Sequence, residues 1–184
     1  RGLHWLEPLV EIETPKGRVA YGPVAASDAA GILADARKGA HKLCLGLTEE
    51  ISFLKRQTRL TFARCGVIDP VSFDDYRAHG GGLGLARALS MEPMAIVEEV
   101  VESGLRGRGG AGFPTGIKWK TVLDTKADQK YVCCNADEGD SGTFADRMLM
   151  EGDPFTLIEG MTIAGIATGA TKGLIYIRSE YPHA

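Results

Sequence analysis

The chain has 184 residues, of which 44% are hydrophobic and 24% charged, and its formal net charge is −3. This composition is typical of a folded globular domain and excludes a disordered or fibrous protein. Because 21 lysines and arginines face 24 acidic residues, no general basic surface is expected for a phosphate backbone, and nucleic acid is not an expected partner. The most apolar stretch, residues 155–170, contains Glu159 and is shorter than the roughly 18 residues that a membrane span needs.

The four cysteines, Cys44, Cys65, Cys133 and Cys134, include no CxxC pair, which disfavours a disulfide framework or a metal cage. Neighbouring residues on a strand point to opposite faces, so the adjacent pair is not expected to bind one metal. We predict reduced thiols, no metal site and a cytoplasmic protein. The chain begins Arg-Gly-Leu-His without a secretion leader, so we expect a processed chain or part of a longer one.

The N-terminal third predicts a small unit. Residues 8–24 alternate apolar and polar side chains around Pro15-Lys16-Gly17, a pattern typical of a β-hairpin. Ser27 is a candidate cap for a short helix that stops at Gly39. Since a hairpin alone is marginally stable in water, we expect this unit to belong to a larger domain.

The middle of the chain predicts a run of helices. Residues 48–64 have acidic residues at the start and basic residues at the end, as a helix favours. A shorter helix is expected over 72–79, before the glycines at 80–82, and Pro93 begins a helix that ends at Gly104.

The C-terminal part predicts an α/β core. Short β-rich apolar runs occur at 131–134 and 174–177, and Asp153-Pro154 opens a long helix between them. Small residues on this helix would let it lie close to a sheet. A strand-helix-strand unit of this kind is expected to form a right-handed parallel crossover.

A glycine-rich loop is the first candidate site. Residues 104–116, GLRGRGGAGFPTG, contain six glycines and two arginines, and Lys118 follows. The backbone N–H groups of such a loop can surround an anion, with Arg106, Arg108 or Lys118 adding positive charge. We therefore predict a phosphate-bearing ligand, and a flexible hinge is the alternative.

The same loop contains a Gly107-x-Gly109-x-x-Gly112 pattern. An ordinary dinucleotide fingerprint needs a strand before the pattern and a helix after it, whereas a helix is expected before it here and Pro114 follows. The ordinary Rossmann interpretation is therefore disfavoured. Phe113 and Trp119 are candidates for stacking on an aromatic ring, although apolar packing is the commoner role of both.

The second candidate site is the acidic loop NADEGDSG, residues 135–142, directly after the first predicted strand. Open α/β sheets bind ligands at the carboxyl ends of their strands. Asn135, Asp137, Glu138 and Asp140 supply groups for ribityl, ribose or ring N–H atoms, and a solvated acidic turn is the alternative. With the basic loop, these residues predict a ligand with a phosphate end and a polar ring end, such as flavin mononucleotide (FMN) or a nucleotide.

Four ordered motifs resemble the flavin-binding, NAD(H)-oxidising subunits of complex I, of NAD-reducing hydrogenases and of NAD-dependent molybdenum or tungsten formate dehydrogenases. These motifs are residues 103–119, 134–147, 153–161 and 175–184. The runs FLKRQTRLTFARCGVIDP and DDYRAHGG most resemble the formate dehydrogenase beta subunit.

The resemblance implies three regions. Residues 1–45 would be the C-terminal part of a thioredoxin-like domain, 46–90 a helical connector, and 91–184 the first part of a Rossmann-like FMN- and NAD(H)-binding domain. It also implies site residues. Glu138 and Asp140 would act in catalysis, and the cofactor-binding set would be Gly107, Arg108, Gly109, Gly110, Ala111, Phe113, Lys118, Asn135, Asp137 and Glu138. In complex I relatives the position of Asp140 is usually Glu followed by Pro, and here Ser141 follows.

The implied cofactors are FMN and NAD, with [4Fe-4S] and [2Fe-2S] clusters in the complete subunit whose ligands are not in this chain. The implied partners are a molybdenum- or tungsten-containing catalytic subunit and a small [2Fe-2S] subunit. The expected reaction is hydride transfer between NAD(H) and FMN, carrying electrons from formate oxidation. A hydrogenase or complex I flavoprotein subunit is an alternative, and so is a non-catalytic nucleotide-binding or assembly module.

Overall fold

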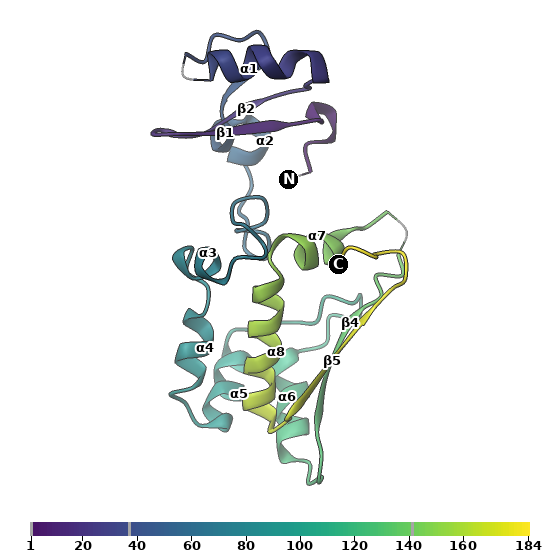
Figure 1. Cartoon of the computed structure of the whole chain (residues 1–184). Coiled ribbons are helices and arrows are strands. Elements are labelled where there is room, and N and C mark those ends of the chain that lie inside the picture. Colours follow the sequence, from purple (N-terminus) through teal and green to yellow (C-terminus); the bar gives the residue numbers. More distant parts are fainter. Residues whose placement is uncertain (1, 37, 141) are drawn as a thin grey trace. The chain divides into compact units, whose positions relative to one another are not determined.

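A computed structural model describes residues 2–36, 38–140 and 142–184, shown in Figure 1. The chain forms two compact units, Arg1–Leu60 and Thr61–Ala184. Each unit has its own sheet and its own buried hydrophobic cluster. The three predicted regions, residues 1–45, 46–90 and 91–184, and their assignment to a thioredoxin-like domain, a connector and a flavin domain stay predictions.

The first unit contains a three-stranded antiparallel sheet in the order β1 (Val10–Thr14), β2 (Gly17–Tyr21) and β3 (Cys44–Leu47). The predicted hairpin is confirmed, because Thr14 pairs with Gly17 across the turn. Gly17 has a φ of +113°, a conformation that glycine adopts without strain. The third strand was not predicted, since its four residues show no alternating pattern.

The other elements of this unit are short helices: η1 (His4–Leu6), η2 (Ala26–Asp28), α1 (Ala29–Asp35), η3 (Thr48–Glu50) and α2 (Ser52–Lys55). The predicted cap at Ser27 is wrong. This residue lies inside a 3-10 turn, and Asp28 instead accepts a hydrogen bond from the Ala25 N–H at 3.0 Å. Tyr21, Val24 and Ile32 form the buried cluster of the unit.

The helix predicted over Thr48–Arg64 is also wrong. Ile51 has a ψ of 124° and separates η3 from α2, which ends at Lys55. The Arg64 Nε donates to the Asp153 carboxylate at 2.8 Å, and its guanidinium lies 4.8 Å from the centre of the Tyr76 ring. These long-range contacts compete with a helical propensity that contributes only fractions of a kilocalorie per residue.

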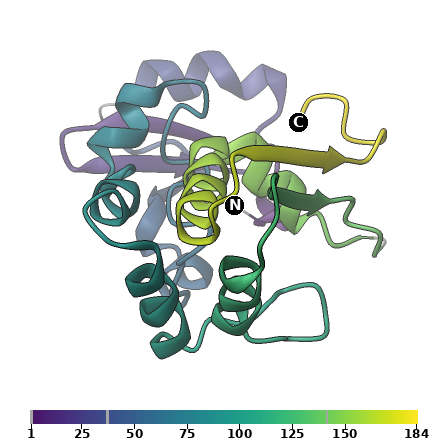
Figure 2. The same ribbon diagram turned by 90° about the horizontal axis from the view of Figure 1, so that it is seen from below.

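The second unit begins with helices and ends with a parallel strand pair. Its elements are α3 (Phe73–Ala78), α4 (Leu83–Ala88), α5 (Pro93–Glu102), α6 (Thr115–Asp124), β4 (Tyr131–Ala136), α7 (Ala145–Gly152), α8 (Pro154–Thr168) and β5 (Lys172–Ile177). The predicted strand-helix-strand unit is confirmed, because β4 and β5 pair in parallel, as Figure 2 shows. Helices α4, α6 and α7 were not predicted.

The long helix α8 organises this unit and contacts α4, α5 and α6 as well as both strands (Figure 1). The Asp153 carboxylate caps it by accepting from the Thr156 N–H at 3.3 Å, and Gly169 ends it at a φ of +74°. Buried Ala167 packs among α5 residues Ile96 and Val97. Ala167, one of the small residues expected to let this helix lie close to the sheet, therefore faces the helices instead.

Glu159 on α8 holds the preceding helices. Its carboxylate accepts from the Tyr76 hydroxyl, from the Gly82 N–H at 2.7 Å and from the Leu85 N–H at 2.8 Å. The last two groups lie at the start of α4, where backbone N–H groups have no partner within the helix.

Across the described residues, no helix is long and apolar enough to cross a bilayer.

Candidate functional site

The glycine-rich loop is closed by its own hydrogen bonds. Gly107 N–H donates to the Phe113 carbonyl at 2.8 Å, and Thr115 N–H donates to the Leu105 carbonyl at 2.9 Å. The Arg106 Nε donates to the Gly112 carbonyl at 2.5 Å. Arg106, one of the candidate cations, therefore stabilises the loop itself.

The glycines inside this closed loop fall into two groups. Gly110 and Gly112 have φ angles of +101° and +59°, so the backbone itself favours glycine there. Gly107 and Gly109 lie outside the positive-φ set. A Cβ at Gly109 would meet nothing within 4 Å, and one at Gly107 nothing nearer than 3.6 Å. The fold does not require glycine at these two positions, whereas close approach of a ligand to the backbone would.

Helix α6 begins directly after the loop, at Thr115, with Pro114 in the capping position. The expectation that no helix follows the glycine pattern is therefore wrong, although helix α5, not a strand, precedes it. The free N–H groups at a helix N-terminus favour anions, and the exposed Lys118 lies in the same first turns. The loop and helix together fit a phosphate group.

The two aromatic candidates near this loop differ. Trp119 packs against the buried cluster of Ala88, Ile96, Val97 and Ala167, so its role is structural. The Phe113 side chain is 52% exposed and remains available for a ligand. Gly116, by contrast, lets α5 and α6 pack closely, because a Cβ there would lie 2.5 Å from a methyl group of Val101.

The acidic loop follows β4, as predicted. Asn135 uses its side-chain oxygen to accept from the Asp137 N–H at 3.1 Å. Asp137 and Glu138 are half-buried and Asp140 is exposed; Ser141 lies outside the described residues. The loop therefore presents carboxylates at the carboxyl edge of the parallel sheet, where α/β folds bind ligands.

Glu138 has the most constrained position in this loop. Its φ is +46°, which is uncommon for a residue other than glycine. Its carboxylate accepts from the backbone N–H groups of Asp146 and of Arg147, the latter at 3.1 Å, and from the Tyr181 hydroxyl at 3.2 Å. The side chain thus caps the start of α7, and the catalytic role expected for it stays a prediction.

The neighbouring strand supplies further residues that the sequence reasoning did not single out. Arg178, directly after β5, donates from Nη1 to the Glu138 carbonyl at 2.7 Å and from Nη2 to the Glu180 carboxylate at 3.0 Å. Tyr181 is buried. The guanidinium groups of Arg178 and Arg147 lie 5.3 and 5.7 Å from the centre of its ring. Arg178 and Tyr181 both come soon after the parallel strand β5. This position at the carboxyl end of a strand was the sequence signal that could have identified them as site residues.

Burial and charge shift several pKa values around this edge. Burial raises the pKa of Asp146, and the Glu138 carboxylate raises it further. Burial likewise raises the pKa of the Cys134 thiol, with a smaller contribution from Asp146. The hydrogen bond from Arg178 lowers the pKa of Glu180 to about 2. The half-buried Asp137 and the exposed Asp140 supply carboxylate acceptors that suit a ligand with N–H or O–H donors.

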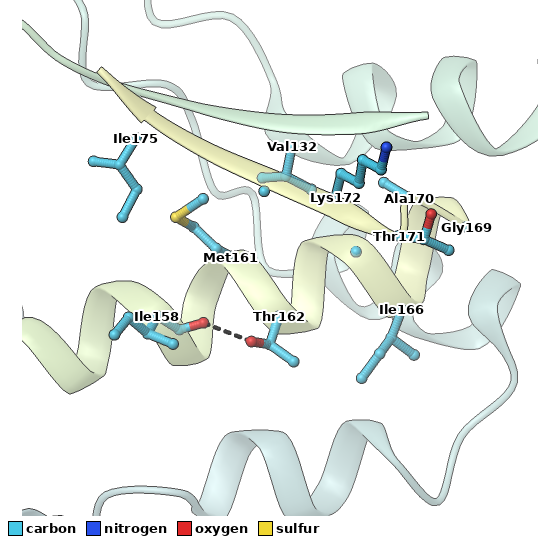
Figure 3. Close-up of a pocket in the computed structure, with 12 residues that line it drawn as sticks. Val132, Ile158, Met161, Thr162, Ile166, Gly169, Ala170, Thr171, Lys172 and Ile175 are labelled. Carbon is cyan, nitrogen blue, oxygen red and sulfur yellow. Dashed lines mark hydrogen bonds between the residues drawn. The ribbon is translucent and has the colours of Figure 1, made fainter. Parts of the chain in front are cut away.

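A separate apolar groove of about 560 Å³ lies between α8 and the sheet. Figure 3 shows Met161 on α8 pointing toward the strands, and Ile158 and Ile166 on α8 and Ile175 on β5 also line the groove. None of the predicted site residues lines it, and its one charged residue is Lys172. Parallel sheets are normally covered on both faces, so the groove is a packing surface rather than a polar ligand site.

The described residues contain no cluster of three or more His, Cys, Asp or Glu side chains that could hold a metal ion. All four cysteines are free thiols. Cys133 is exposed and Cys134 half-buried on β4, which confirms that the two side chains point to opposite faces.

A glycine-rich loop before a helix, together with an acidic loop at the carboxyl edge of a parallel sheet, is an arrangement typical of nucleotide-binding α/β proteins. Residues 100–184 match the model of the Nuo51 FMN-binding domain. This part of the chain matches the family of FMN- and NAD-binding subunits found in complex I and in hydrogenases.

Several relatives carry names from these assemblies. The chain is 58% identical over 130 residues to the NADP-reducing hydrogenase subunit HndC of Solidesulfovibrio fructosivorans, covering 71% of this chain and 26% of the relative. It is 50% identical over 97 residues to the alpha subunit of the NAD-reducing hydrogenase HoxS of Cupriavidus necator, covering 53% and 16%. It is 46% identical over 117 residues to an NADH-quinone oxidoreductase subunit of Escherichia coli, covering 62% and 26%.

The fold also resembles a crystal structure of an NAD+-reducing [NiFe]-hydrogenase in the air-oxidised state. The TM-score is 0.53 at 26% identity, and the match covers 89% of this chain and 27% of the hydrogenase chain. The chain thus spans about a quarter or less of these relatives.

Proposed function

We propose that residues 61–184 form part of the FMN site of an NAD(H)-oxidising flavoprotein subunit. The observation that carries this proposal is the pair Gly107 and Gly109. A Cβ at Gly109 would meet nothing within 4 Å, and one at Gly107 would make only ordinary contacts from 3.6 Å, within a segment that matches an FMN-binding domain. FMN, when bound, supplies the hydride-accepting ring, while the protein supplies placement and electrostatics.

The chain's own residues divide this task between the two loops. In the proposal, the N–H groups of residues 108–111 and the N-terminus of α6 hold the phosphate, with Arg108 and Lys118 adding positive charge. Asn135, Asp137 and Glu138 face the polar end of the flavin. Phe113 and Asp140 lie on the NAD(H) side and orient the nicotinamide for transfer.

The test is an anaerobic NADH titration of the protein isolated with its native partners, followed by flavin absorbance. Bleaching by NADH and recovery with NAD+ are the expected results. A preparation that contains flavin but stays oxidised with NADH would support the alternative of a non-catalytic nucleotide-binding or assembly module, and so would one without flavin.

We further propose that the electrons come from formate, through a molybdenum- or tungsten-containing subunit and a small [2Fe-2S] subunit, in a cytoplasmic complex with its own [4Fe-4S] centre. The support is the resemblance of residues 53–70 and 74–81 to the formate dehydrogenase beta subunit. Hydrogen is the second candidate donor, because the relatives named above include two hydrogenase subunits.

NAD+ reduction by the purified complex distinguishes these donors when formate and H2 are supplied separately. Formate-driven NADH formation, with molybdenum or tungsten in the metal analysis, is the expected result. Activity with H2 alone, together with nickel or iron and no molybdenum or tungsten, would overturn the formate assignment and leave the flavin proposal intact.

A further inference from the structure

We propose that Arg178 and Tyr181 are positioning residues for the FMN and NAD(H) site. They hold Glu138, and through it the acidic loop, from the neighbouring strand. This inference rests on the proposed function, because the loop they hold is the one that would face the flavin ring.

Arg178 fixes the backbone of the loop. The Ile177–Ala136 pair is the last of the parallel register, so Arg178 and Glu138 leave the two strands at almost the same level. From there the Arg178 Nη1 reaches the Glu138 carbonyl at 2.7 Å. Glu138 has a φ of +46°, and such backbone conformations persist only where surrounding contacts impose them.

Arg178 is itself restrained. Its other terminal nitrogen bonds to the Glu180 carboxylate at 3.0 Å, and its side chain is only 23% exposed. Its guanidinium also lies over the Tyr181 ring, an arrangement that attracts a cation to the ring face. A fork held at two points can set the position of the carbonyl that it contacts.

Tyr181 fixes the side chain of the same residue. Its ring is buried in a cluster with Ala136 and Met150, and its hydroxyl donates to the Glu138 carboxylate at 3.2 Å. Main chain and side chain of Glu138 are thus held by two residues from one short segment. We call these two contacts of Arg178 and Tyr181 with Glu138 the clamp. Asp137 and Asp140 lie within two residues of Glu138, so their positions depend on it.

The experiment compares binding of two flavins by the deflavinated full-length protein with and without Arg178→Gln. Riboflavin has the ring and ribityl chain of FMN but lacks its phosphate. A displaced acidic loop affects the ring end, so we expect both flavins to bind at least tenfold more weakly, by the same factor. We also expect KM for NADH to rise more than kcat falls, since placement rather than the reacting group is altered.

Two further variants keep the test decisive. Tyr181→Phe retains the buried ring and removes only the hydroxyl, and we expect a smaller loss, about threefold, for both flavins. Arg87→Gln is the matched control, because Arg87 forms an ion pair with Glu99 at 2.8 Å on the surface of another part of the unit. That variant should leave both flavin affinities unchanged.

Three results would overturn the inference. Unchanged affinities in both Arg178→Gln and Tyr181→Phe would show that the clamp does not position the site. Weaker binding of FMN with normal binding of riboflavin would make Arg178 a direct phosphate ligand. If the Arg178→Gln variant does not fold, unchanged flavin affinities in Tyr181→Phe alone would overturn the inference. An unmodified protein that binds no flavin contradicts the proposed function before any variant is compared.

Discussion

The glycine-rich loop and the acidic loop are built in opposite ways. The first is closed by its own hydrogen bonds, and a Cβ at Gly109 would have open space around it. The second is held from outside, because Glu138 is bonded by α7 and by the segment after β5. A loop that offers its backbone to a ligand needs free space, whereas a loop that offers carboxylates needs them fixed in direction.

The largest expected effect on ligand binding comes from the open space at Gly109. We expect Gly109→Ala to weaken FMN binding at least tenfold, about 1.4 kcal/mol, because the added methyl group occupies space that the ligand would use. The melting temperature of the deflavinated protein should stay unchanged, since nothing lies within 4 Å of that methyl group. Isothermal titration and thermal unfolding measure the two quantities.

Gly110→Ala is the matched variant for this prediction. Its φ of +101° disfavours any side chain, at a cost of about 1–2 kcal/mol, so it should lower both stability and flavin affinity. If Gly109→Ala binds FMN normally, the space beside that residue does not hold the ligand.

A second prediction concerns the stability that Glu159 of α8 provides through its contacts with α3 and α4. Glu159→Gln removes a carboxylate that accepts from Tyr76, Gly82 and Leu85. We expect a loss of about 2 kcal/mol in unfolding free energy at pH 7, the usual range for hydrogen bonds to a charged group. Chemical denaturation measures this loss. Glu99→Gln, on an exposed ion pair, should change stability by less than about 1 kcal/mol.

The same residue gives the expected pH dependence. Burial alone would raise the pKa of Glu159, but the hydrogen bonds from Tyr76 and from the start of α4 outweigh it and lower the pKa below 4.5. In the folded state the Glu159 carboxylate therefore binds a proton less readily than in the unfolded chain. The free energy of unfolding consequently falls as pH drops below about 4.5. Glu159→Gln should remove this part of the acid sensitivity. An equal loss at pH 7 and at pH 3 would contradict the assignment.

A third prediction tests the charge in the acidic loop. Negative groups near a flavin disfavour added electron density, so Glu138→Gln should raise the flavin midpoint potential. We expect a shift of about 30 mV, which corresponds to about 1.4 kcal/mol for a two-electron couple. Spectroelectrochemical titration measures it, and an unchanged midpoint would remove Glu138 from this role.

The smallest effect uses a glycine with open space but no expected ligand. A Cβ at Gly160, within α8, would also meet nothing within 4 Å. Gly160→Ala should stabilise the helix by about 0.5–1 kcal/mol, measured by thermal unfolding, and leave FMN affinity unchanged. A loss of flavin here would show that open space around a glycine does not identify the site.

Local sequence determined the elements that depend on nearby residues. The hairpin around Gly17, the helix opened by Asp153-Pro154 and the two parallel strands follow from turn residues, caps and apolar runs. The two candidate loops could also be located from the sequence, because glycines gather in residues 104–116 and acidic residues in residues 135–142. Each of these signals lies within a few residues of the structure it specifies.

Tertiary contacts decided the rest. Residues 48–64 have a helical pattern, yet Arg64 binds Asp153, which is 89 positions away. The clamp on Glu138 joins residues 40 and 43 positions apart, a separation that no local pattern encodes. The sequence thus predicts which residues carry chemistry, whereas the pairing of β4 with β5 decided which side chains hold the acidic loop in place, because only that register brings the two strand ends together.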